Sequence, residues 1–220
     1  MPELNSALHV NMLKESYALG QQARDGLYGI QWGDPETRPQ LQQVRDHFVL
    51  PYVRPDHTAL EIGPGGGRWT RYMLGFKKLW AVDYHQELLD ELARNFPQPN
   101  IARVKNNGTD FPGIPPGSVD FVFSFGVFVH LTMELHKAYL QSLRPVLKKS
   151  ANVIIQFADF DKKASRDNPN FVENNPRMMR AMVEEAGYAV LEEDASLWHS
   201  AMIRFGLPAG GRTKAVKAKA

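Results

Sequence analysis

The chain has 220 residues, of which 43% are hydrophobic and 23% are charged. These fractions are ordinary for globular proteins, so we expect one packed domain with additions rather than two full domains. The sequence contains no cysteine, which excludes a disulfide framework and thiolate metal sites, and we expect no bound metal. No apolar run reaches the length of a membrane span and no signal peptide is recognisable, so we expect a cytoplasmic protein without a membrane partner.

The net charge of +2 arises at the end of the chain. Four cations follow Pro208 in a stretch without acids, and without them the remaining chain has a net charge of +2 minus 4, which is −2. A body with this charge is not typical of a nucleic-acid-binding protein, so we expect no nucleic-acid partner. Residues 208–220 are predicted to form a flexible basic tail.

A glycine loop organises the rest of the sequence. The run from Thr58 to Ile62 predicts a short buried strand, four glycines follow at positions 63, 65, 66 and 67, and a helix is predicted over Trp69–Leu74. Glycines allow positive φ angles and a close approach of backbone amides to a ligand, so the loop is a candidate small-molecule site. A dinucleotide fingerprint has glycine or alanine where Arg68 stands, which disfavours a nicotinamide-dependent dehydrogenase.

Two acids lie at the ends of the first two predicted strands. Glu61 ends the first strand, where a buried carboxylate needs a partner, either a ligand or a group of the loop that it caps. Asp83 ends the second strand, Leu79–Asp83, sixteen residues after Gly67. This separation is typical of an acid that binds a nucleotide ribose, because a carboxylate accepts two hydrogen bonds from a diol. Alternatively, Asp83 caps the helix that begins near Gln86.

The other elements alternate between strands and helices. Strands are predicted at 101–105, 118–125, 151–157, 188–192 and 200–205. Helices are predicted within 3–30 and at 41–50, 87–96, 134–144 and 176–186. A turn at Lys148–Ala151 is expected to precede the strand that begins at Ala151. This alternation favours an α/β protein with a mostly parallel sheet.

The pattern Glu61-x-Gly63-x-Gly65-x-Gly67 resembles motif I of the class I S-adenosylmethionine-dependent methyltransferases, and a weaker resemblance extends from about Trp32 to about Phe205. The resemblance implies a Rossmann-like, seven-stranded, mostly parallel sheet with strand order 3-2-1-4-5-7-6, strand 7 antiparallel, and helices on both faces. It also implies a single methyltransferase domain over residues 1–207. Residues 1–55 would form an N-terminal helical cover and residues 56–207 the core.

The same resemblance implies S-adenosyl-L-methionine as the cofactor. Its amino-acid part would lie on the glycine loop beside Glu61, its ribose on Asp83, and its adenine beside Asn107 and Gly108, with Asp110 as the less favoured alternative to Asn107. Asn-Gly is also a common simple turn, so a purely structural role for Asn107 stays open. Further cofactor contacts are expected from residues before motif I and after the second and fourth strands, namely Trp32, Tyr84, Ser124 and Phe125.

His130 is the candidate catalytic residue, since it follows the central fourth strand at the sheet edge where α/β proteins bind ligands. An imidazole there would take a proton from an attacking hydroxyl or amine. The alternative is a histidine packed against Phe128 and Leu131 and bonded to backbone. The polar segment 158–175 is either a substrate lid, with Asp159, Asp161 and Phe171 facing the acceptor, or a solvated loop.

These features predict a methyltransferase that moves a methyl group to an oxygen or nitrogen of a small-molecule or saccharide acceptor. The alternative is a non-enzymatic module that binds S-adenosylmethionine or a nucleotide and acts through a protein or nucleic-acid partner. It is supported by the basic tail and by the lack of a clear acid-base pair. A nucleic-acid methyltransferase is disfavoured, because no Asn-Pro-Pro-aromatic segment follows the fourth strand.

Overall fold

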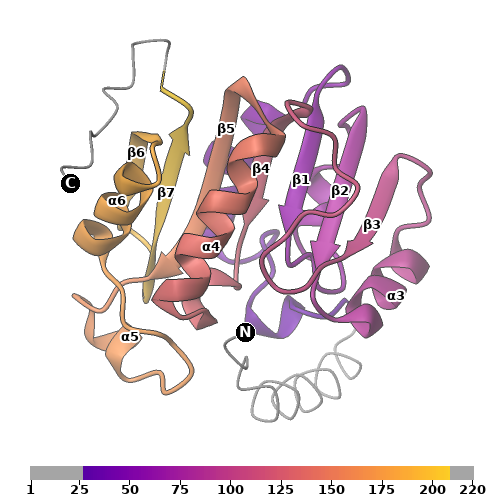
Figure 1. The fold of residues 1–220 in the computed structure, drawn as a ribbon. Coiled ribbons are helices and arrows are strands. Elements are labelled where there is room, and N and C mark those ends of the chain that lie inside the picture. Colours follow the sequence, from indigo (N-terminus) through magenta and orange to yellow (C-terminus); the bar gives the residue numbers. More distant parts are fainter. Residues whose placement is uncertain (1–26, 209–220) are drawn as a thin grey trace, which may run out of the picture.

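The computed structural model describes residues 27–208 (Figure 1). The tail after residue 208 and most of the helix predicted within residues 3–30 lie outside the described residues. In the described part, seven strands form one sheet of order β3-β2-β1-β4-β5-β7-β6, which confirms the predicted order. The strands are β1 (Thr58–Ile62), β2 (Lys78–Asp83), β3 (Ile101–Lys105), β4 (Val119–Ser124), β5 (Leu147–Ala158), β6 (Ala189–Asp194) and β7 (Ser200–Gly206).

The first five strands are parallel, and β7 runs antiparallel to both β5 and β6. The predicted antiparallel seventh strand is therefore confirmed. β1 lies between β2 and β4, and its last residue, Ile62, pairs with Val82 on one side and Ser124 on the other. The loops that follow these three strands consequently emerge next to one another at one edge of the sheet. This edge is where parallel α/β proteins bind ligands.

The helices follow from capping and breaking residues. They are α2 (Pro39–Val44), α3 (Gln86–Asn95), α4 (Met133–Leu143), α5 (Lys163–Arg166) and α6 (Pro176–Glu185), and α2 continues through a π turn (Arg45–Val49) into a 3-10 turn (Leu50–Tyr52). Asn175 caps α6 by accepting a hydrogen bond from the Met178 amide at 2.9 Å, and Pro176 occupies the first helical position. Gly187, with φ of 81°, follows the helix and ends it, in agreement with the helix predicted at 176–186. No helix within residues 27–208 is long and apolar enough to cross a membrane.

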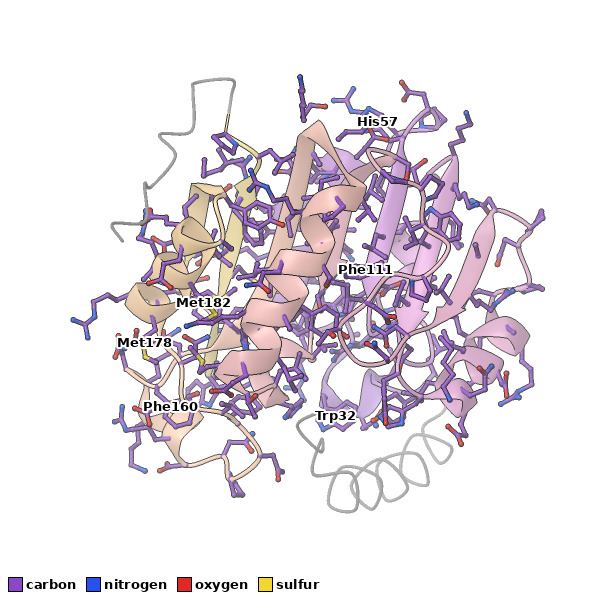
Figure 2. All side chains as sticks on the ribbon, in the orientation of Figure 1. Trp32, His57, Phe111, Phe160, Met178 and Met182 are labelled. Atoms are coloured by element: carbon purple, nitrogen blue, oxygen red, sulfur yellow. The ribbon has the colours of Figure 1, made fainter. Side chains whose placement is uncertain are left out.

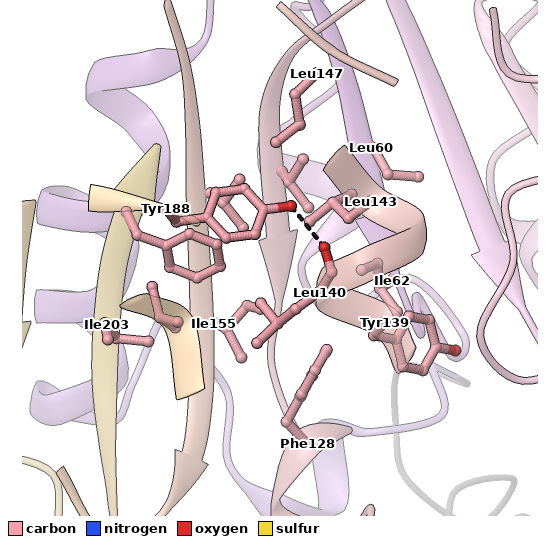
Figure 3. Close-up of a cluster of buried hydrophobic side chains, with 14 of the residues drawn as sticks. Leu60, Ile62, Phe128, Tyr139, Leu140, Leu143, Leu147, Ile155, Tyr188 and Ile203 are labelled. Carbon is pink, nitrogen blue, oxygen red and sulfur yellow. Dashed lines mark hydrogen bonds between the residues drawn. The ribbon is translucent and has the colours of Figure 1, made fainter. Parts of the chain in front are cut away.

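The sheet is covered on both faces. Alternate strand residues point to opposite sides, so Leu60 and Ile62 join one core with α4 and α6, whereas Ala59 joins the other core with α2 and the π turn. Figure 3 shows the first core, in which the Tyr188 hydroxyl donates a 2.7 Å hydrogen bond to the Leu140 carbonyl. The continuous apolar pattern of β4 and β5 reflects this burial on two faces.

Two predicted elements differ from the structure. The helix expected over Trp69–Leu74 is a single 3-10 turn, Thr70–Tyr72, because the Thr70 hydroxyl is drawn to Glu61 and the turn closes through a Met73 amide bond to the Thr70 carbonyl. The turn expected at Lys148–Ala151 belongs to β5, which begins at Leu147.

The early start of β5 has an electrostatic cause. Leu147 of β5 pairs with Val119 of β4, and the register between the two strands shifts before the next pair, Asn152 with Phe121. Across this irregularity the Lys148 ammonium contacts both carboxylate oxygens of Asp120 at 2.8 and 2.9 Å. The ion pair ties the start of β5 to β4, so a sequence that suggests a turn is extended instead.

Candidate active site

A cavity of about 510 Å³ lies where β1, β2 and β4 end. Figure 2 places Trp32 at this edge of the molecule and His57, which precedes β1, at the opposite edge. We divide the cavity into two parts. The glycine end is lined by Gly63, Gly65, Arg68, Asp83 and Tyr84, and the histidine end by His130, Gln156, Phe171, Trp198 and His199.

The glycine loop is shaped by close contacts with its surroundings. Gly63 has a φ of 71°, and a β-carbon there would lie 2.2 Å from Val127 Cγ2. A β-carbon on Gly66 would lie 2.4 Å from the Tyr28 backbone nitrogen, because the segment before α2 crosses the loop. The Gly66 amide donates to the Tyr28 carbonyl at 3.3 Å. Only glycine satisfies both the backbone angle at 63 and the crowding at 66.

Asp83 is buried and lines the cavity beside the glycine loop. Burial raises the pKa of its carboxyl to about 6, although amide groups of His85, Gly65 and Tyr84 stabilise the charged form. Its Oδ1 accepts a 2.9 Å hydrogen bond from the amide of His85. His85 directly precedes the first residue of α3. A carboxylate held in this way keeps acceptor capacity for a ligand in the cavity.

Glu61 is buried behind the glycine loop and does not line the cavity. Its Oε2 accepts a 2.6 Å hydrogen bond from the Thr70 hydroxyl. Burial raises the pKa of the Glu61 carboxyl to about 8, so the group is largely protonated near neutral pH. The structure thus supplies the internal partner that the sequence leaves open as the alternative to a ligand.

Arg68 is a site residue that motif reasoning uses only to disfavour a dinucleotide. Its guanidinium is buried, lines the cavity and donates to the Gly33 carbonyl at 3.4 Å. It lies over the rings of Trp69 and Phe125, at 5.8 and 5.3 Å from the ring centroids. Burial lowers the pKa of Arg68 to about 10, which leaves the group charged at neutral pH. A buried cation of this kind is suited to a ligand carboxylate or phosphate.

The Asn106–Asp110 turn places its two asparagines differently. Asn107 is exposed and does not line the cavity, because its Oδ1 accepts from the Thr109 and Asp110 amides at 3.1 and 3.2 Å. Asn106 is buried, accepts from the Gly108 amide at 3.1 Å and donates to the Tyr139 hydroxyl at 3.1 Å. Gly108 and Tyr139 both line the cavity. The sequence offers no signal that separates two adjacent asparagines.

The other predicted cofactor residues fall into two groups. Ser124 and Gly67 do not line the cavity, since the Ser124 hydroxyl donates to the Ile62 carbonyl at 3.0 Å and Gly67 packs against Phe96. The predicted residues that do line it are Trp32, Gly63, Gly65, Asp83, Tyr84, Gly108, Phe125 and His130. Eight of the predicted residues, from segments up to about a hundred positions apart, therefore meet at one cavity.

The histidine end contains two imidazoles on either side of one phenyl ring. His130 and His199 contact the Phe171 ring edge to face, with centroid separations of 5.5 and 5.1 Å. The His130 Nδ1 donates to the Asn170 carbonyl at 2.9 Å, which joins the loop after β4 to the 158–175 segment. Of the three lid residues predicted in that segment, Phe171 alone lines the cavity.

Gln156 connects the loop after β4 with the start of β7. It accepts from the Gly126 amide at 2.7 Å and donates to the Ser200 hydroxyl at 2.7 Å. Gly126 follows β4, and Ser200 begins β7 beside His199. Sequence reasoning missed Gln156 because a single polar residue inside an apolar strand indicates neither a ligand nor its neighbours.

The strand order and the cavity at the carboxyl ends of β1, β2 and β4 define a Rossmann-like fold, which binds ligands at this edge of the sheet. Residues 59–150 match the model of a family described as a methyltransferase domain. These residues run from β1 into β5 and include the glycine loop, and the match confirms the resemblance to methyltransferases inferred from motif I.

Solved structures share this architecture at low sequence identity. The complex of DhpI with SAH has a TM-score of 0.67 and 17% identity, covering 91% of this chain and 96% of that one. A SAM-dependent methyltransferase from Aquifex aeolicus has a TM-score of 0.57 and 18% identity, covering 76% and 93%. The glycopeptide N-methyltransferase MtfA with SAM has a TM-score of 0.60 and 13% identity, covering 76% and 87%. At such identities these likenesses establish the fold. The search of curated protein sequences found no significant match.

Proposed function

We propose that this protein is an S-adenosylmethionine-dependent methyltransferase that acts on an oxygen or nitrogen of a small-molecule or saccharide acceptor. The observation that carries the proposal is that Asp83 and the glycine loop face one cavity of about 510 Å³ within a methyltransferase domain. This volume suits a ligand of nucleoside size together with part of a second molecule. The domain match favours an enzyme over the alternative of a non-enzymatic binding module.

The residues of the glycine end fit the chemical groups of S-adenosylmethionine. Asp83 offers carboxylate oxygens to the ribose diol, and Arg68 offers a buried cation to the methionine carboxylate. Gly63 and Gly65 let the backbone approach the ligand closely. Gly108 and Tyr139 form the wall on the side proposed for the adenine. When bound, the cofactor supplies a methyl group on a positively charged sulfur.

The protein's main contribution is alignment. Gly126, Gln156 and Ser200 form a hydrogen-bonded chain that holds the loop after β4 against the start of β7, two segments that line the cavity. Such positioning supplies much of the rate in a displacement reaction. His130 lines the cavity at the end of a central strand, and we assign it the role of taking the proton of the attacking group.

Names of structural neighbours support the cofactor and the acceptor class. One neighbour is a complex with SAH, and another is a glycopeptide N-methyltransferase bound to SAM.

The described residues contain no group of three or more His, Asp or Glu side chains arranged to hold a metal ion.

Two measurements test the proposal. Calorimetry of the full chain should show binding of S-adenosylmethionine and none of NADH. A coupled assay of S-adenosylhomocysteine release over pooled metabolite fractions should then show turnover, with a gain of one methyl group in the product by mass. Binding of NADH in preference to S-adenosylmethionine would refute the cofactor assignment, and cofactor binding without turnover in any fraction would favour the non-enzymatic module.

A further inference from the structure

The loop between β6 and β7 presents a tryptophan to the cavity. Trp198 lines the histidine end, yet 72% of its surface is exposed, the largest value for a bulky apolar side chain among residues 27–208. The next largest value, 56%, belongs to Trp32, which lines the same cavity. Indole rings left in water at the rim of one cavity indicate surfaces that a ligand covers.

This loop is held firmly despite its exposed tryptophan. The Lys162 ammonium donates to the carbonyls of Ala195, Leu197 and Ser200 at 2.6 to 2.8 Å, and Asp159 balances its charge at 3.1 Å. On the other side, the Gln40 amide oxygen accepts from the Trp198 backbone nitrogen at 3.3 Å. The exposure of Trp198 is therefore a property of a fixed loop, and its ring is presented in a defined place.

The charges of the cavity are confined to the glycine end. Among the lining residues the structure describes, Arg68 and Asp83 carry formal charges, and both lie beside the glycine loop. The histidine end offers imidazoles, the amide of Gln156 and the hydroxyl of Ser200. A carboxylate, phosphate or ammonium group bound there would meet no Asp, Glu, Lys or Arg side chain of opposite charge among the described lining residues, so this lining favours an uncharged ligand.

His199 adds a group that both donates and accepts hydrogen bonds. Its Nδ1 is buried without a hydrogen-bond partner in the described structure. Most buried polar atoms of folded proteins have such a partner, because leaving one unpaired costs free energy. Burial and the nearby Lys162 ammonium lower the pKa of His199, so the ring is neutral at pH 7. Across Phe171 its neighbour is His130, and Asp159 is engaged by Lys162. A neutral imidazole, like the Gln156 amide, matches hydroxyl groups, which also donate and accept.

We propose that the acceptor is an uncharged saccharide whose ring stacks on Trp198 and whose hydroxyl groups hydrogen bond with His199 and its neighbours at the histidine end. A pyranose suits this surface because one face presents C–H groups to an aromatic ring while its edge carries hydroxyls. The inference rests on the proposed methyltransferase function. In the reaction, a sugar oxygen forms a bond to the methyl carbon, the carbon–sulfur bond breaks with its electrons left on sulfur, and the hydroxyl proton passes to His130.

The first experiment asks which acceptors are labelled. The full chain is incubated with S-adenosylmethionine labelled in the methyl group and an array of neutral oligosaccharides, uronic-acid oligosaccharides, sugar phosphates, phenols and amines. Label is expected in neutral saccharides alone. Label in the charged, phenolic or amine members, or in none of the array, would overturn the inference. Calorimetry with S-adenosylmethionine on the same sample separates this outcome from failure of the proposed function, in which the cofactor itself does not bind.

The second experiment tests the two recognition residues on the labelled saccharide. Trp198→Leu and His199→Gln should each raise the KM by at least about tenfold, with the affinity for S-adenosylmethionine changed less than about twofold. Trp198→Phe keeps an aromatic face and should recover most of the loss. Leu191→Ala on β6 and His47→Gln in the π turn Arg45–Val49 are matched controls outside the cavity. Equal KM values in Trp198→Leu and Leu191→Ala, both folded by thermal melting, would overturn the assignment.

Discussion

The two ends of the cavity are built in opposite ways. The glycine end comes from the adjacent ends of β1 and β2, and it carries buried charges at Arg68 and Asp83. Glu61 is buried behind the loop. The histidine end is assembled from segments that start as far apart as α2 and β7, and none of its described lining residues is Asp, Glu, Lys or Arg. Buried charge is costly without a partner, and this difference underlies the proposed binding of an ionic cofactor at the glycine end and an uncharged acceptor at the histidine end.

The largest expected effect comes from Glu61, the buried acid behind the glycine loop. Burial raises the pKa of Glu61 to about 8 from its ordinary 4.5, so the folded state binds this proton more tightly than the unfolded chain does. Its contribution to the free energy of unfolding is complete below about pH 4.5 and is lost as the pH rises to about 8. Because each tenfold change in proton affinity corresponds to about 1.4 kcal/mol, the loss is on the order of 3 to 5 kcal/mol.

Glu61→Gln tests this pH-dependent loss of stability, because the amide keeps the Thr70 contact but has no titratable proton. Urea unfolding of both proteins between pH 5 and pH 8 measures the difference, which should grow in favour of the variant as the pH rises. Glu184→Gln, at an exposed ion pair with Arg180, is the control and should follow the wild type. A constant difference across this range would mean that Glu61 is ionised in the folded protein.

The next effect concerns the backbone of the glycine loop. Gly63 and Gly113 have similar φ angles of 71° and 75°, but a β-carbon would lie 2.2 Å from Val127 at Gly63 and meets nothing within 4 Å at Gly113. Both alanine variants strain the backbone, whereas Gly63→Ala also crowds the loop that leads to the histidine end. We expect about 1 to 2 kcal/mol of destabilisation for Gly113→Ala and about 2 to 4 for Gly63→Ala.

Calorimetry on the same glycine pair separates stability from binding. Gly63→Ala should weaken the binding of S-adenosylmethionine, and Gly113→Ala should leave it unchanged. If both variants bind the cofactor like the wild type, the glycine loop does not contact it.

Asp83 gives the third effect. Asp83→Ala removes carboxylate oxygens from the cavity wall and should weaken S-adenosylmethionine binding by about 1 to 3 kcal/mol, the loss expected for buried hydrogen bonds to a ribose. Calorimetric titration measures the change, and Asp90→Ala on the exposed side of α3 serves as the matched control. An unaltered titration of Asp83→Ala would remove the ribose assignment and return Asp83 to a structural role at the end of β2.

The same contrast explains how much of the site the sequence predicts. Gly63, Gly65 and Asp83 lie at fixed spacings in consecutive strand and loop units, so local pattern predicts both their elements and their convergence. Gln156, Trp198 and His199 meet through tertiary packing of β5 with β7, which no short spacing encodes. Lys148 shows that the same is true of the fold: the segment that begins at Lys148 is expected to be a turn, but it is strand, and its ion pair with Asp120 is a tertiary contact. The sequence therefore predicts the sheet and the residues of the glycine end other than Arg68, and only His130 and Phe171 of the histidine end.

The smallest effect distinguishes the adjacent asparagines at the glycine end. The Asn107 amide oxygen accepts hydrogen bonds from the Thr109 and Asp110 amides. The Asn106 side chain instead bonds to Gly108 and Tyr139, which line the cavity. Asn107→Ala should therefore change the dissociation constant of S-adenosylmethionine less than about twofold, or about 0.4 kcal/mol, and Asn106→Ala should weaken binding by about 1 kcal/mol. Each variant is the control for the other in one calorimetric series. A larger loss in Asn107→Ala would restore the adenine contact that motif resemblance assigns to Asn107, because the turn would then have to release that side chain toward the ligand.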